Sequence, residues 1–138
     1  MSENIISSDV ADEQIEALKL YYDIDVDDLP DNVKGAIVSS FKKIKRAIME
    51  GRLEIEVTDD TILVKQTLCK VPAGVPGTLA YKEVSGQSKV AIRDDSTDHG
   101  KMYAFMGALC GEGSKAILAL KGKDLSLAES LGCVFLQV

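Results

Sequence analysis

The catalytic chemistry that this sequence could offer centres on His99, its single histidine. His99 ends the sequence DDSTDH, so carboxylates and a hydroxyl lie beside it, and three cysteines stand elsewhere at Cys69, Cys110 and Cys133. An Asp-His-Ser or Asp-His-Cys arrangement would require the fold to bring distant groups together, and nothing in the spacing demands it. We therefore interpret the segment as a polar surface loop and expect no enzyme. An enzyme that uses His99 and a cysteine is the alternative.

An aspartate-rich segment has part of the pattern of a calcium site. Asp23, Asp25 and Asp27 stand at alternate positions, as the first oxygen ligands of a calcium loop do. Asp28 then stands where that loop needs a glycine, and Lys34 stands where it needs a bidentate glutamate. We therefore interpret the segment as a solvated acidic linker, and we expect no metal and no cofactor.

Two further motifs could bind phosphate groups. The sequence GEGSK at 111–115 follows a predicted helix and places serine before lysine, whereas a phosphate loop follows a strand and has the reverse order. We interpret it as a turn between helices. A basic cluster is formed by Lys42, Lys43, Lys45 and Arg46. Because 22 acidic residues outnumber 16 basic ones, for a net charge of -6, we interpret this cluster as a solvated helix face and expect no nucleic acid partner.

The composition bounds the fold that must position these residues. The chain has 138 residues, of which 46% are hydrophobic and 28% charged, and a chain of this length buries roughly two thirds of its unfolded surface in a single core. The N-terminal sequence MSENIISSDV lacks the basic and apolar regions of a signal peptide. No uncharged run approaches the roughly 20 residues of a membrane span. We expect a soluble protein with free thiols in a reducing cytoplasm and no contact with a membrane.

The N-terminal part is predicted to be helical. Residues 11–22 follow a short helical pattern, whereas the sequence DIDVDDLPD at 23–31 disfavours both helix and strand. A long amphipathic helix is predicted over residues 32–50, with Asp31 as its N-cap and Gly51 just beyond its end. Its apolar residues recur at steps of three and four: Val33, Ile37, Phe41, Ile44 and Ile48.

From residue 52 the pattern changes to a period of two. Apolar and polar residues alternate over 53–57 and again over 62–68, which predicts a β-hairpin, and Leu79 and Tyr81 indicate a third strand within 78–84. We expect Asp124 to cap the last helix of the chain. Short helices are predicted over 88–94, 102–110, 116–120 and 124–135.

These elements predict an α+β fold with N-terminal helices, a small antiparallel three-stranded sheet and a C-terminal cluster of short helices. The whole chain, 1–138, is expected to form a single domain. Its segments are the N-terminal helix and acidic linker (1–30), the long amphipathic helix (31–51), the hairpin with the third strand (52–84) and the helical remainder (85–138).

The C-terminal region carries more apolar residues than one short helix can bury on a single stripe. We expect the surplus to face a partner or a second copy of the chain, with Phe135 as an aromatic anchor and Met106 as an adaptable contact. The residues expected on this surface are Phe105, Met106, Leu131, Val134, Phe135 and Leu136.

Three parts of the chain carry a family pattern. They are the alternating hairpin LEIEVTDDTILVKQTL, the strand and short helix within TLAYKEVSGQSKVAIRD, and the final stretches KMYAFMGALCG and ILALKGKDLSLAESLGCVFL with their L-x-G-x-D-L junction. Together they resemble the tail assembly chaperones of long-tailed bacteriophages, including the Mu-like group. The resemblance covers about residues 53–136 and leaves the helical region before Gly51 outside it.

The resemblance implies a non-enzymatic protein of the infected or lysogenic bacterial cytoplasm. Such a chaperone binds the long helical tape measure protein and keeps it soluble until tail tube subunits polymerise around it, so the tail tube protein is a second expected partner. A structural phage or prophage component, such as a head decoration or tail completion protein, is the alternative.

Overall fold

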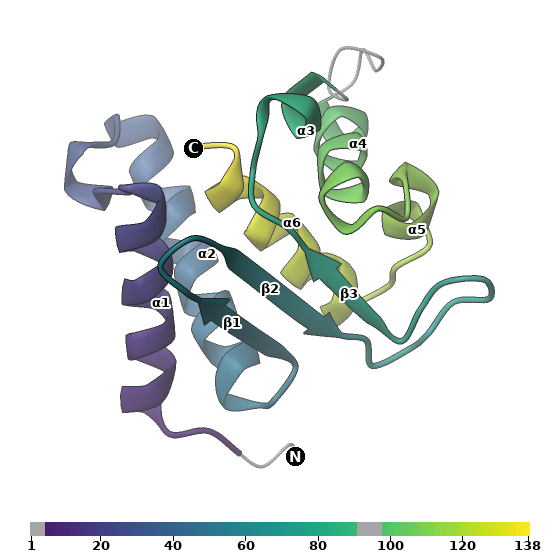
Figure 1. Cartoon of the computed structure of the whole chain (residues 1–138), viewed down its shortest axis with the longest axis horizontal. Helices are drawn as coiled ribbons and strands as arrows, with labels where there is room; N and C mark the ends of the chain where they lie inside the picture. Colours follow the sequence, from purple (N-terminus) through teal and green to yellow (C-terminus); the bar gives the residue numbers. More distant parts are fainter. Residues whose placement is uncertain (1–4, 91–97) are drawn as a thin grey trace.

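A computed structural model describes residues 5–90 and 98–138, without the side chains of residues 98 and 99. This part of the chain forms the predicted α+β fold, with six α-helices and a three-stranded antiparallel sheet (Figure 1). The helices are α1 (Ser8–Tyr22), α2 (Asp31–Met49), α3 (Gly86–Val90), α4 (Asp98–Cys110), α5 (Ser114–Leu118) and α6 (Lys123–Phe135), with a 3₁₀ helix, η1 (Val26–Asp28). The strands are β1 (Leu53–Val57), β2 (Ile62–Thr67) and β3 (Thr78–Tyr81). Among the described helices, none combines the length and the apolar character that crossing a membrane requires.

The sheet has one face toward the core and one toward solvent. Its strands lie in the order β1-β2-β3, and its register aligns Ile55 with Val64 and Val64 with Tyr81. These three side chains are buried. Because side chains alternate along a strand, the other face carries Glu56 and Lys65, which form an ion pair at 3.1 Å. The predicted hairpin and third strand are confirmed, although the third strand ends at Tyr81.

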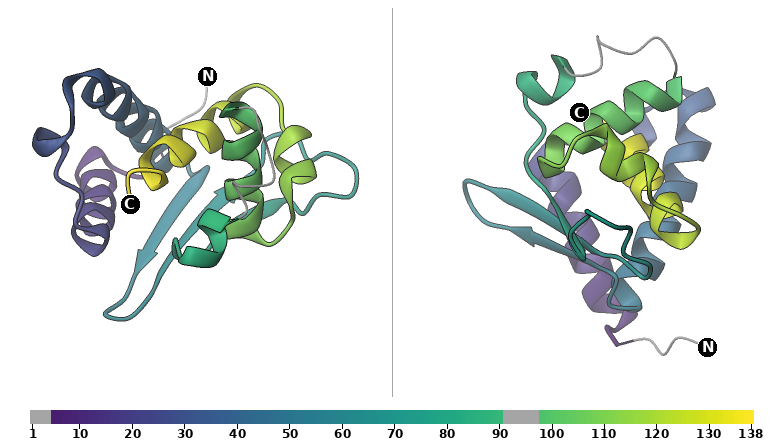
Figure 2. Two further views of the ribbon diagram at one scale, coloured as in Figure 1. Left: turned by 90° about the horizontal axis from the view of Figure 1, so that it is seen from above. Right: turned by 90° about the vertical axis from the view of Figure 1, so that its right-hand side faces the viewer.

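The helices gather on the buried face of this sheet. Figures 1 and 2 show α2, α4 and α6 on the same side of it, with α1 beside β1. α6 packs against both α2 and α4, and α4 also contacts β3 and α5. A Cβ at Gly107 of α4 would lie 2.2 Å from the carbonyl carbon of Gly113. Only glycine therefore allows the turn after α4 to approach that helix so closely.

A buried polar network joins the sheet to α6. The Tyr81 hydroxyl donates to Gln66 Oε1 (2.8 Å), and Gln66 Nε2 donates to the carbonyl oxygen of Asp124 (2.9 Å). The Asp124 carboxylate accepts from the backbone amides of Cys69 (2.9 and 3.0 Å) and Lys70 (3.0 Å). The side chains of Tyr81, Gln66 and Asp124 are all buried. Each hydrogen bond therefore satisfies a polar group that burial removes from water.

α1 covers the outer edge of the sheet. Gln14 Oε1 accepts a hydrogen bond from the amide of Ile55 (2.9 Å), an edge group that β2 does not reach. Near the C-terminal end of α1, the Tyr21 hydroxyl donates to Glu83, and this hydrogen bond raises the pKa of Tyr21 to about 12. The Tyr22 hydroxyl accepts from the amide of Val84 (3.0 Å). Polar contacts thus hold α1 to the sheet region at its middle and at its C-terminal end.

Two predicted helix caps are wrong. Asp31 is the first residue of α2, whose N-cap is Pro30. Asp124 lies in the first turn of α6, whose N-cap is Gly122, because its carboxylate binds the loop after β2 and not the start of its own helix. Gly51 does follow the end of α2 as predicted, with φ of +77°.

The acidic linker also differs from its prediction. Its aspartates are exposed, as expected, but the segment contains η1, and Ile24, Val26 and Leu29 pack against the core. The linker is therefore anchored by its apolar residues. The helix predicted over 88–94 is α3, Gly86–Val90, and the rest of that prediction lies outside the described residues.

Asp124→Ala is expected to lower the free energy of unfolding by about 2–4 kcal/mol, because two backbone amides lose a charged acceptor and a cavity remains. Urea unfolding measures the loss. Lys123→Ala, an exposed neighbour in α6, is the control and should stay within about 0.5 kcal/mol of wild type. A loss under about 1 kcal/mol for Asp124→Ala would contradict the role given to this carboxylate.

Candidate functional site

The surface predicted at the C-terminus is a core. Five of its six residues are at most 1% exposed: Phe105, Met106, Leu131, Val134 and Phe135. Only Leu136, at 39%, reaches solvent. The fold does bring α4 and α6 together, since a Cβ at Gly132 would meet Met102 and Met106 side chains, but the contact is internal. The expectation that these five side chains face a partner is therefore wrong for this structure.

The reason lies in the position of α6. A single exposed helix buries one stripe, but α6 lies between α2 and α4. Even Ser130 and Gly132 on this helix are buried, so burial extends over most of its circumference. A helix that is apolar on most sides is one that other elements surround. The surplus of apolar residues thus reflects a central helix.

The proposed catalytic groups receive no support from their surroundings. The side chain of His99 and the residues Asp94, Asp95 and Ser96 lie outside the described part of the chain. Partial desolvation and the neighbouring Asp124 carboxylate raise the pKa of the Cys69 thiol, and burial raises the pKa of the Cys110 thiol. A nucleophilic cysteine needs a lowered pKa.

The other candidate motifs have structural roles. Within the described residues, no three His, Cys, Asp or Glu side chains are grouped to hold a metal ion. Asp25 Oδ1 accepts from the amide of Asp27 (3.0 Å), and Asp27 pairs with Lys34 at 3.3 Å. Residues 111–113 form the turn between α4 and α5, as predicted, whereas Ser114 and Lys115 already belong to α5.

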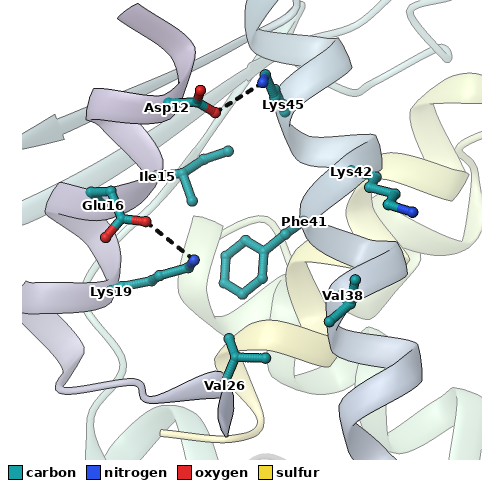
Figure 3. Close-up of a pocket in the computed structure, with 9 residues that line it drawn as sticks. All are labelled: Asp12, Ile15, Glu16, Lys19, Val26, Val38, Phe41, Lys42 and Lys45. Carbon is teal, nitrogen blue, oxygen red and sulfur yellow. Dashed lines mark hydrogen bonds and ion pairs between the residues drawn. The ribbon is translucent and has the colours of Figure 1, made fainter. Parts of the chain in front are cut away.

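An open groove between α1 and α2 is the best candidate site. It encloses about 300 Å³. Figure 3 shows Phe41 pointing from α2 into the space between the helices, with Ile15 on the α1 side and Val26 of η1 at one end. The groove, hereafter the α1–α2 groove, is lined by Asp12, Ile15, Glu16, Lys19, Val26, Val38, Phe41, Lys42 and Lys45.

One ion pair joins the two walls of this groove, and a second lies within α1. Asp12 of α1 pairs with Lys45 of α2 at 3.0 Å (Figure 3). Glu16 pairs with Lys19 at 3.3 Å, and the Lys19 ammonium lies 4.8 Å from the centre of the Phe41 ring. That distance permits a cation–π interaction. The α1 wall therefore presents two carboxylates and Lys19, the α2 wall presents two lysines, and the floor between them is apolar.

A second hollow extends the groove along the linker. It encloses about 460 Å³ and shares Glu16, Lys19 and Val26 with the first. Leu20, which is 81% exposed, lines it together with aspartates of the linker. An exposed leucine beside an apolar groove provides a contact for a partner that follows both hollows.

This site escaped the sequence interpretation. Val38 and Leu20 are apolar residues that fall off the buried stripes of their helices, at 39% and 81% exposure. That misplacement is the one signal the sequence offers for the groove. An apolar floor between two helices, with charged rims, can hold the apolar face of a third helix.

Comparison with known proteins gives no family for this chain. No protein-family model, curated protein or solved structure matches this chain.

Adjacent substitutions on α2 test which face forms the groove. Ile37→Asp is expected to unfold the protein, because Ile37 is buried and an unpaired carboxylate there costs several kcal/mol. Val38→Asp should change the free energy of unfolding by at most about 0.5 kcal/mol, because its side chain already reaches solvent. Thermal unfolding of both variants measures the difference, and equal destabilisation would contradict the assigned face.

Proposed function

We propose that this protein is a non-enzymatic tail assembly chaperone of a long-tailed phage or prophage. In the bacterial cytoplasm it binds the tape measure protein and keeps it soluble until the tail tube protein polymerises around it. The observation that carries the proposal is the α1–α2 groove, an apolar floor with charged walls that is open at the surface. The resemblance of residues 53–136 to such chaperones supports the same function.

The groove favours an amphipathic helix as its occupant. Val38, which is 39% exposed, offers an apolar contact to one face of such a helix, and Phe41, which is 8% exposed, lies at the base of the groove next to the Lys19 ammonium. Carboxylates on the α1 wall and lysines on the α2 wall would then orient it, because a helix with basic residues on one flank and acidic residues on the other fits only one way. A tape measure protein, as a long helical chain awaiting its tube, exposes surface of this kind.

The rest of the surface suits a protein that keeps another one soluble. The net charge is -6, and charge of this size opposes association between like complexes. Two exposed apolar residues far from the groove in sequence, Val71 and Leu118, lie on different elements. Covering the groove would leave a charged complex.

Co-expression tests the proposal. The tape measure protein encoded by the same phage should move to the soluble fraction and co-purify with the tagged chain. Val38→Asp should reduce the captured amount at least about fivefold, because it places a carboxylate in the apolar floor. Val71→Asp introduces the same charge at an exposed site on the loop between β2 and β3 and should capture as much as wild type.

Two outcomes would contradict the proposal. If the folded wild-type chain captures no tape measure protein, the chaperone function fails. If immunoblots find the chain in purified virions at the copy number of a structural subunit, the head decoration or tail completion alternative replaces it. Equal loss in both variants would contradict the placement of the binding site in the groove.

A further inference from the structure

A third hollow lies on the neighbouring stripe of α2, where this helix meets the segment before β1 and the start of α6. It encloses about 240 Å³. Four cationic side chains line it, and we call it the cationic hollow: Lys43, Arg46, Arg52 and Lys123. Its remaining lining residues, Gly122, Ser126 and Leu127, carry no charge. A quarter of the 16 basic residues of an acidic chain thus meet at one small site.

These cations are poorly neutralised by the described part of the chain. Arg46 and Lys123 form no ion pair there, and Lys43 Nζ reaches only the Ser126 hydroxyl at 3.4 Å. Arg52 donates from Nε and Nη2 to Glu50 Oε1, at 3.2 and 2.8 Å. The positive charge of the hollow therefore exceeds the negative charge that faces it.

Arg52 supplies an independent sign of a missing acceptor. Its Nη1 is buried and has no hydrogen-bond partner within the described structure. A buried guanidinium nitrogen without an acceptor is costly, and native structures rarely leave one in that state. An anionic group that enters the hollow and draws the guanidinium toward it would supply the acceptor.

The start of α6 adds to the positive potential. This 13-residue helix begins at Lys123, its N-cap is Gly122, and no side chain caps it. Helix N-termini favour negative charge because their first amides and the helix dipole point toward it. The one carboxylate in that turn, Asp124, is committed to the amides of Cys69 and Lys70.

We propose that the cationic hollow binds carboxylate side chains of an acidic segment in a partner protein. Its small volume suits one or two carboxylates, and the guanidinium of Arg46, which forms no ion pair within the described residues, can pair with such a group in a bidentate geometry. A nucleic acid fits less well, because the net charge of -6 repels an extended polyanion while a short acidic segment meets only the local field. This inference does not depend on the proposed chaperone function.

Fluorescence anisotropy with a fluorescein-labelled hexaglutamate peptide tests the proposal. The full chain should bind this probe saturably, and raising the salt from about 50 mM to about 500 mM should weaken the binding. Arg46→Glu and Lys43→Glu change exposed side chains of the hollow and should each weaken binding at least about tenfold. Lys115→Glu makes the same kind of charge change at an exposed position of α5 and should leave binding within about twofold of wild type.

Three outcomes would overturn the proposal. The peptide binds no more tightly to wild type than to Arg46→Glu, or Lys115→Glu weakens binding as much as the hollow variants do. In the third outcome, a single-stranded oligonucleotide binds the hollow more tightly than the peptide does, and the site is then assigned to nucleic acid. Thermal melts of every variant confirm that each is folded, and Arg46→Glu and Lys43→Glu provide two independent tests of one site.

Discussion

The fold depends on one buried carboxylate. The Asp124 carboxylate accepts hydrogen bonds from the backbone amides of Cys69 and Lys70. Its backbone carbonyl oxygen accepts one from the Gln66 side chain, whose own oxygen accepts from the Tyr81 hydroxyl. These contacts fix α6 to β2, β3 and the loop between them. Since α6 is also the helix against which α2 and α4 pack, its position sets the place of both helices. The groove and the cationic hollow share α2 as a wall, so both sites follow from that arrangement.

The sequence predicts the elements whose patterns are local. The stripe through Ile37, Ile44 and Ile48 predicts α2, and alternation predicts the hairpin, because burial of one face imposes a period on each element. The role of Gln66 could not be predicted from a local pattern. It is a polar residue at a core position of β2, and its hydrogen-bond partners lie 15 and 58 residues away. Asp124 is similar, since its partners at Cys69 and Lys70 are 55 and 54 residues away.

The expectation of an apolar binding surface at the C-terminus is wrong for a related reason. Apolar content identifies what will be buried, but not whether another chain or the same chain buries it. The sequence of Phe135 and Leu131 fits burial by a partner as well as burial in the core. They lie in the core because α6 packs against both α2 and α4. The α1–α2 groove could not be predicted because it exists only between two helices. Val38 lines it, and its exposure depends on how closely α1 approaches.

α2 thus lines both candidate sites, and α6 holds it in place. Hydrogen-deuterium exchange of the chain with and without bound tape measure protein tests which helices that protein covers. Backbone amides of α1 and α2, Ser8–Tyr22 and Asp31–Met49, should exchange more slowly in the complex, because a helix in the groove covers both and suppresses their local opening. The exchange rates of the backbone amides of α4 and α5 should be the same with and without the bound protein. Protection confined to α4, α5 and the C-terminus, with α1 and α2 unaffected, would contradict the account.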